Sequence, residues 1–238
     1  MAGHSKWANI KHKKGRDDAK KGKIFSRCAK EIISAVKQGG LDPKANTKLR
    51  LALQKAKAAN VPSDVIDRNI KKASSADQAD FTELTYELYG HGGVGIIVDA
   101  MTDNKNRTAS DVRIATNKKG GSIGSPGSVA FNFDRKGVIQ IGKDQGDEES
   151  LFMQATDAGA DDFDVAEDTF IVVTPPDLLY EVKDKLEDAG IAVGETSLEM
   201  IPKITVPSDG DTRAANEALI EFLEELDDVD AVFHNMED

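Results

Sequence analysis

Hydrophobic residues recur at helical spacing in the first third of the chain, which predicts three short amphipathic helices. The first helix begins at Ile24 and ends at the two glycines Gly39 and Gly40. Asp42-Pro43 is typical of an N-cap followed by proline at the first helical position, so we expect the second helix to begin there. Val61-Pro62-Ser63 interrupts the pattern before the third helix. The three apolar stripes consist of Phe25, Ala29, Ile32 and Val36, then Leu49, Ala52, Leu53 and Ala56, then Val65, Ile66 and Ile70.

Beyond a predicted linker at 74–77 the hydrophobic period becomes mixed, and strands alternate with helices. The first series has strands at 84–89 and 94–101, a helix at 105–118 and a strand at 129–133. The second series has a strand at 138–141, a helix at 147–158, strands at 162–166 and 170–173, a helix at 177–188 and a strand at 196–204. The chain closes with a helix at 213–226 and a strand at 229–233.

These series predict an α+β protein of three domains. The order βαββαβ of the second series is the ferredoxin-like arrangement. The first series is incomplete alone, so we expect the last helix and strand to return and complete it. The predicted domains are a three-helix bundle (1–75), a discontinuous α/β sandwich domain (76–134 plus 205–238) and the ferredoxin-like domain inserted into it (135–204).

Charge is divided unevenly between the two ends of the chain. The net charge is −11, yet residues 1–75 hold 19 Lys and Arg against 6 Asp and Glu, a local charge of +13. The remaining residues carry −24. Binding responds to the field within about a Debye length, ~8–10 Å, so a basic end can hold phosphate although the whole chain is acidic.

Residues 1–23 form a basic arm without a hydrophobic period. Dense lysine and arginine suit phosphate neutralisation, since each contact releases counterions. Trp7 within the arm fits either a stack on an exposed base or a staple onto the helices. A solvated tail, or an arm held by the acidic domains of the same chain, is the alternative. The nucleic-acid-binding residues predicted are Lys6, Trp7, Lys11, His12, Lys13, Lys14, Arg16, Lys20, Lys21, Lys23 and Arg27.

A polar run at 102–108 is the second candidate contact surface. Its spacing does not fit a calcium loop, and its two cations would oppose a metal. An Asp or Asn cap on the following helix is the structural alternative. The candidate contact residues are Asp103, Asn104, Asn106, Arg107 and Thr108.

Several function classes lack their expected signals. The single cysteine, Cys28, excludes an intramolecular disulfide and a cysteine-based zinc site, and the four histidines lack metal-ligand spacing. The nucleophile elbow, the zinc-protease motif and the phosphate loop have no match. Residues 90–95 match G-x-G-x-x-G but run into a strand, which predicts a hairpin turn and no dinucleotide site. With no apolar leader and no spanning segment, we expect a cytoplasmic protein without cofactor or membrane partner. No oligomeric state follows from the pattern.

The opening MAGHSKWANIKHKKGRDDAKKGKIFSRCAKEI, the later TDNKNRT and the segment GSVAFNF closely resemble the YebC/PmpR family. The resemblance covers essentially the whole chain, with a signature at Gly3–Lys6, Lys11–Lys14 and Lys20–Phe25. It implies a helical domain and two α/β domains, the third inserted into the second. It also implies DNA-binding transcription regulation. Relatives such as the mitochondrial translational activator of cytochrome oxidase subunit one imply translation regulation, and bacterial relatives imply relief of stalling at proline-rich sequences.

We therefore expect a non-enzymatic, nucleic-acid-binding regulator of gene expression. DNA and ribosomal RNA are both candidate partners, because a lysine-dominated arm suits phosphate contact without base reading. The alternative to a DNA-binding transcriptional regulator is a ribosome-associated translation factor that binds ribosomal RNA and relieves stalling. A nucleic-acid-processing enzyme is the remote alternative.

Overall fold

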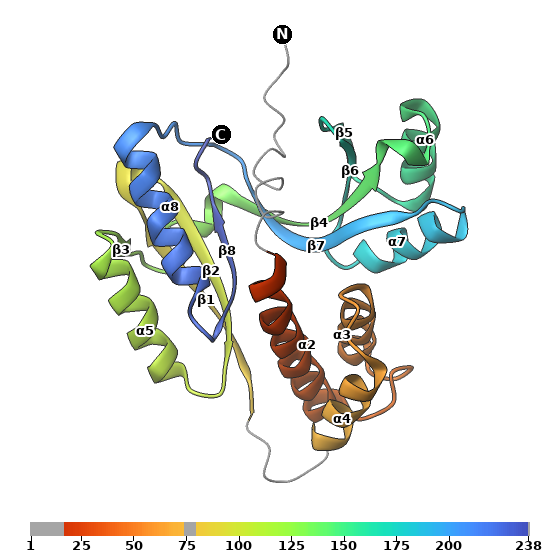
Figure 1. The fold of residues 1–238 in the computed structure, drawn as a ribbon, viewed down its shortest axis with the longest axis horizontal. Helices are drawn as coiled ribbons and strands as arrows, with labels where there is room; N and C mark the ends of the chain where they lie inside the picture. Colours follow the sequence, from red (N-terminus) through yellow and green to blue (C-terminus); the bar gives the residue numbers. More distant parts are fainter. Residues whose placement is uncertain (1–16, 74–79, 238) are drawn as a thin grey trace. The chain divides into compact units, whose positions relative to one another are not determined.

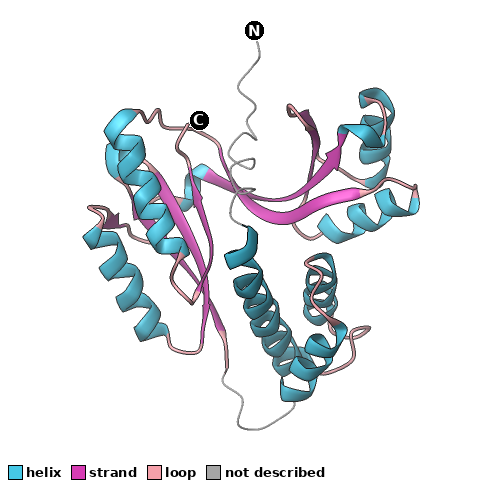
Figure 2. Cartoon of the chain, viewed as in Figure 1, coloured by secondary structure: helices cyan, strands magenta, loops and turns pink. Residues whose placement is uncertain are grey.

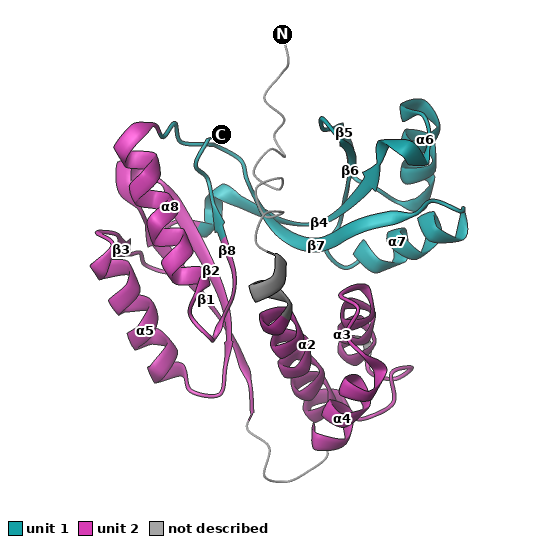
Figure 3. Ribbon diagram, in the orientation of Figure 1, with its two compact units in different colours: residues 1–14, 130–208, 233–238 teal, residues 15–129, 209–232 magenta. Residues whose placement is uncertain are grey.

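A computed structural model describes residues 17–73 and 80–237, which form three helices and two four-stranded sheets with helices (Figure 1, Figure 2). This confirms the predicted α+β class. The described residues belong to two compact units, one within 15–129 and 209–232, the other within 130–208 and 233–238 (Figure 3). We still propose the domain boundaries predicted from the sequence, which fall after residues 75, 134 and 204. Among the described helices, none combines the length and hydropathy needed to cross a membrane.

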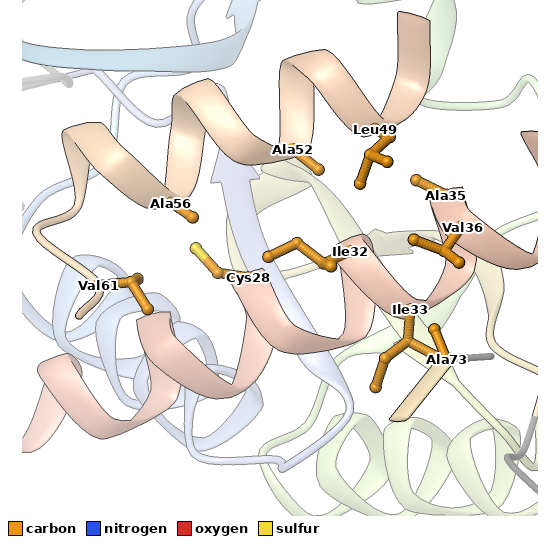
Figure 4. Packing of buried hydrophobic residues seen from close by; sticks show 10 residues of the cluster. All are labelled: Cys28, Ile32, Ile33, Ala35, Val36, Leu49, Ala52, Ala56, Val61 and Ala73. Carbon is orange, nitrogen blue, oxygen red and sulfur yellow. The ribbon is translucent and has the colours of Figure 1, made fainter. Parts of the chain in front are cut away.

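The three helices pack around small and branched apolar side chains. α2 contacts both other helices, and its Cys28, Ile32 and Val36 meet Leu49 and Ala56 of α3 (Figure 4). Every residue of the predicted stripes except Ala29 belongs to this core or packs against it, and Cys28 and Ile33 take part as well. The helices are α2 (Asp17–Gly39), α3 (Thr47–Ala58) and α4 (Ser63–Ala73).

Two predicted helix starts are wrong. α2 is helical from Asp17, so the arm does not extend to residue 23; alanine and lysine favour helix without an apolar stripe. α3 begins at Thr47, whereas Asp42-Pro43 lies in a turn. Asn46 is the true N-cap and accepts from the Leu49 amide at 3.0 Å. The buried Asn46 amide also donates to the carbonyls of residues 35 and 40, which a cap at Asp42 could not reach.

The first sheet has the strand order β3-β1-β2-β8, so the last strand of the chain lies beside β2. The predicted return of the tail is therefore confirmed. Helices α5 and α8 contact one another, and α5 also contacts β1, β2 and β3 (Figure 1). The strands are β1 (Thr82–Tyr89), β2 (Gly95–Thr102), β3 (Ser122–Ile123) and β8 (Val229–His234), and the helices are α5 (Lys105–Lys118) and α8 (Gly210–Glu224).

The glycine-rich segment joins β1 to β2 as an antiparallel hairpin, which confirms the turn predicted there. A short 3-10 turn, His91–Gly93, carries Gly92 at φ 68° and Gly93 at φ 83°, values that favour glycine. Asn216 of α8 hydrogen-bonds to the backbone of this turn. Its side chain accepts from the His91 amide at 2.7 Å and donates to the His91 carbonyl at 3.1 Å.

The second sheet has the order β5-β6-β4-β7 with every neighbouring pair antiparallel, which is the ferredoxin-like order. Its core includes Val138, Ile171, Val173 and Ile201. The strands are β4 (Phe133–Gly142), β5 (Asp162–Val165), β6 (Thr169–Thr174) and β7 (Val193–Pro202), and the helices are α6 (Glu148–Ala158) and α7 (Leu179–Asp188).

The predicted strand at 129–133 is wrong, and the two-residue β3 was not predicted. Residues Ala130–Asn132 form a 3-10 turn, and β4 begins only at Phe133. Just before β4, a side chain takes up the backbone amides that a strand partner would otherwise bond. The buried Glu87 carboxylate accepts from the Gly127 and Val129 amides at 2.5 and 2.6 Å. These bonds replace a strand ladder.

Candidate nucleic-acid interface

The predicted nucleic-acid ligands divide into those outside and those inside the described residues. Lys20 and Lys21 belong to the first turns of α2, and Lys23 and Arg27 follow them on the same helix. The other predicted ligands, Lys6, Trp7, Lys11, His12, Lys13, Lys14 and Arg16, lie outside the described residues.

Lys23 is half-buried and contacts the end of α8. Its ammonium donates to the carbonyl oxygens of Glu224 and Leu226, the latter at 2.7 Å. Burial lowers the pKa of Lys23, and the nearby carboxylates Asp230 and Glu224 oppose that effect. This lysine is therefore already coordinated within the chain.

Arg27 is tied to the same stretch of chain. Its Nε donates to Glu31 at 3.1 Å, and its Nη1 donates to the Asp230 carbonyl at 3.2 Å. Although burial opposes the charge, Glu31 and Asp230 raise the pKa of Arg27. Burial also raises the pKa of Asp230, against the attraction of Arg27. The Arg27 charge is therefore balanced internally.

Asp228 is the centre of this contact. Its buried carboxylate accepts from Thr102 at 3.0 Å and Thr108 at 2.9 Å, and from Arg107 at 2.8 and 3.2 Å. The Lys30 ammonium lies 3.4 Å from its second oxygen. Burial alone would raise the pKa of Asp228, but the hydrogen bonds from Arg107, Thr108 and Thr102 outweigh it and lower that pKa.

We call this set of contacts the acidic seam: the cations of α2 and α5 on one side and residues 224–230 on the other. Lys30 extends it by donating to the Met101 and Asp227 carbonyls at 3.1 and 3.2 Å. The seam lines a cleft that also holds Asp103 and Asp111. Carboxylates offset the cations there, so the seam is a contact within the chain and a poor place for phosphate.

The candidate contact surface at 103–108 has a structural role. Asn104 is the N-cap of α5 and accepts from the Arg107 amide at 3.1 Å, which matches the structural alternative weighed for this run. Arg107 pairs with Asp103 and Asp228, both at 2.8 Å. Thr108 is buried, whereas Asp103, Asn104, Asn106 and Arg107 are exposed. A contact role for the exposed four stays a prediction.

A second group of cations was not singled out from the sequence. Lys44, Arg50, Lys57 and Lys71 are exposed, and no ion pair to them is seen within residues 17–73 and 80–237. Arg50 and Lys57 are seven residues apart and share one face of α3. Both lie off the apolar stripe of that helix, which was the signal available in the sequence. These four can still neutralise phosphate.

No group of three or more His, Cys, Asp or Glu side chains in the described part of the chain is arranged to hold a metal ion. The lone thiol, Cys28, lies in the bundle core, where burial raises its pKa.

Comparisons with known proteins cover nearly the whole chain. A probable transcriptional regulatory protein of Protochlamydia amoebophila is 66% identical over 99% of this chain and 96% of its own length. One from Chlamydia pneumoniae is 58% identical over 99% of this chain and all of its own. The crystal structure of the conserved hypothetical protein Aq1575 from Aquifex aeolicus superposes with a TM-score of 0.83 at 42% identity, covering 98% of this chain and 97% of that one.

Two family models match the chain, one over its basic first third and one over the rest. Residues 5–76 match the TACO1/YebC protein N-terminal domain, and residues 81–236 match the TACO1/YebC second and third domain. The curated relatives bear the names of regulators and not of enzymes, in agreement with the non-enzymatic prediction. The chain therefore belongs to the TACO1/YebC family.

Proposed function

We propose that this chain is a cytoplasmic, non-enzymatic regulator of gene expression that binds nucleic acid through residues 1–75, with DNA as the target in a transcriptional role. The observation that carries the proposal is the segregation of charge, +13 at residues 1–75 against −24 in the rest. Phosphate binding gains with each cation that releases counterions, and the acidic remainder repels the same ligand. Binding is thereby confined to the basic end.

The contacts of the described cations support a narrower set of proposed phosphate-binding residues. Lys23, Arg27 and Lys30 are engaged by the acidic seam, so their charge is already offset. Lys44, Arg50, Lys57 and Lys71 are the exposed alternatives, and we assign them to the interface together with the arm. The four lie on two helices and in the turn before them, which suits a grip on the phosphate backbone more than reading of base edges.

A transcriptional role is supported by the names of the relatives, which are probable transcriptional regulatory proteins. Translation at the ribosome is the second candidate, favoured by the polarity of the chain. A ribosome offers RNA to the basic end and basic proteins to the acidic body, whereas DNA offers only phosphate. In that case the chain would bind ribosomal RNA and relieve stalling.

Binding of the full chain to a fluorescent 20-base-pair duplex between 50 and 200 mM salt tests the proposal. Alanine at Lys44, Arg50, Lys57 and Lys71 together should flatten the slope of log affinity against log salt by about 3–4, at ~0.9 per phosphate contact. Alanine at the arm residues Lys11, Lys13 and Lys14 should flatten it by about 2–3.

The matched control removes four cations from the acidic part of the chain: Lys136, Lys143, Lys185 and Lys203. It should leave the slope unchanged and lower affinity only slightly, because it adds negative charge to the chain without removing a phosphate contact. Equal losses of affinity in this control and in the Lys44, Arg50, Lys57 and Lys71 variant would refute the assignment of the interface.

Sedimentation of cell extract at moderate salt, with and without ribonuclease, separates the two roles. Recovery of the chain on specific promoter fragments at physiological salt, with none on ribosomes, supports the transcriptional role. Ribonuclease-sensitive co-migration with ribosomes, lost in the Lys11, Lys13 and Lys14 variant, would instead establish the translational one.

A further inference from the structure

The ferredoxin-like domain exposes a cluster of large apolar side chains. Phe152 and Met153 of α6 are 50% and 59% exposed, and Val165 of β5 is 38% exposed. The Phe152 ring meets Phe163 edge-on with centroids 5.8 Å apart, and Phe163 stacks on the buried Phe170 at 5.5 Å. The exposed ring is therefore held in place by a stack that reaches the core. We call Phe152, Met153, Phe163 and Val165 the apolar patch.

The segment that carries the patch is rich in carboxylates. Residues 147–168 hold nine Asp and Glu and no Lys or Arg. On α6, Glu149 precedes Phe152 by three residues and Asp157 follows Met153 by four, so helical geometry sets all of them on one exposed face. Large apolar clusters on a surface mark interaction sites, and this one carries an acidic rim.

The patch lies beside an edge strand that is closed to strand addition. β5 is the edge strand of its sheet. The amide of Ala166, the residue after β5, donates to the carbonyl of Thr169 in β6. The amides of Phe163 and Val165 alternate with that bond and point to the open edge. They donate instead to the carboxylates of Asp162 and Asp164, at 2.9 and 2.8 Å. A partner must therefore dock through side chains.

We propose that the apolar patch is a docking surface for a protein that presents a basic amphipathic segment, with large apolar side chains between lysines or arginines. The apolar side chains would cover Phe152 and Met153, and the cations would meet Glu149 and Asp157. The carboxylates of this segment outnumber the nearby cations and disfavour nucleic acid as the occupant. They equally disfavour a second copy meeting through the same patch, because a two-fold contact would place like charges together. The inference uses a different segment from the nucleic-acid interface and stands apart from it.

The probe is a fluorescent synthetic amphipathic peptide of leucine and lysine, titrated against the full chain. Replacing Phe152 and Met153 by serine should weaken binding at least tenfold, as expected when central apolar contacts are removed. Met153→Ser alone, which spares the stacked rings, should weaken it several-fold. Glu149→Gln with Asp157→Asn should weaken binding at low salt and reduce its salt dependence.

Ile114→Ser is the matched control, because Ile114 of α5 is also 59% exposed but lies outside the ferredoxin-like domain. It should leave peptide binding unchanged. The proposal is overturned if the Phe152 and Met153 variant binds as tightly as the natural chain, or if Ile114→Ser loses as much. Peptide binding that is detected only after deletion of residues 1–16 would assign the patch to the chain's own basic arm and also overturn the proposal.

Discussion

Replacing Asp228 by asparagine should destabilise the first unit of the fold while leaving the shape of the side chain unchanged. In the native chain the Asp228 carboxylate accepts from Thr102 and Thr108, which are 0% and 1% exposed, and from the Arg107 guanidinium. All of these bonds end on one carboxylate oxygen, Oδ2, so an asparagine oxygen placed there keeps the contacts but loses the charge that strengthens them. The amide group then replaces Oδ1 and presents a donor to the Lys30 ammonium, which also donates.

The expected cost follows from those bonds. A hydrogen bond to a charged group contributes about 1.5–3 kcal/mol, and bonds to one shared carboxylate do not add fully. We therefore expect the free energy of unfolding to fall by about 2–4 kcal/mol. Urea unfolding measures the loss, and hydrogen exchange of peptides covering β2 and the α5 N-terminus locates it.

Asp227→Asn is the control, since it removes the same charge one residue earlier. Asp227 is exposed, and no hydrogen bond or ion pair to its carboxylate is seen within the described part of the chain. It should change the free energy of unfolding by less than about 0.5 kcal/mol. If both variants lose the same amount, Asp228 acts only through net charge and the account of the seam is refuted.

Three further outcomes are expected. The stability gap between the natural chain and Asp228→Asn should be constant from neutral pH to about 5 and close below about pH 4. The lowered pKa of Asp228 gives a contribution that is present above its unfolded value and lost as pH falls through the folded one; a gap that widens in acid would contradict this. Asn104→Ala should cost about 1 kcal/mol through loss of the α5 cap, whereas Asn104→Ser should restore most of it, as thermal unfolding would show. Cys28 should react with a disulfide reagent only in denaturant, because its thiol is buried and its pKa raised; rapid reaction of the native chain would refute this.

Local patterns in the sequence predicted the elements that depend on local physics. The α5 helix begins and ends where its polar cap and apolar spacing predict, at Lys105 and Lys118. The βαββαβ order likewise emerges as a single antiparallel sheet. The starts of α3 and β4 were predicted wrongly, because hydrogen bonds from residues distant in the sequence fix them. Asn46 replaces Asp42 as cap because it also bonds the end of α2, and Glu87 shapes residues 127–129 from 40 residues away.

The destination of the basic side chains could not be predicted for a different reason. A run of cations has the same sequence pattern whether it faces phosphate or carboxylates of its own chain. Lys23 and Arg27 find their partners 203 residues further on, near the C-terminus. Only the packing of α2 against residues 224–230 distinguishes them from Arg50 and Lys57, which keep their charge exposed.

The place of β8 in the first sheet sets an order for folding during synthesis. All four strands of the ferredoxin-like sheet lie between residues 133 and 202, so that sheet can close before the chain is finished. The first sheet must wait for residues 229–234, because β8 pairs beside β2. Until then the nascent chain leaves the edge of β2, with its Ile96-Ile97-Val98 run, without a neighbour strand and open to aggregation. A premature stop that removes only the last ten residues would therefore promote aggregation more strongly than the loss of ten residues suggests.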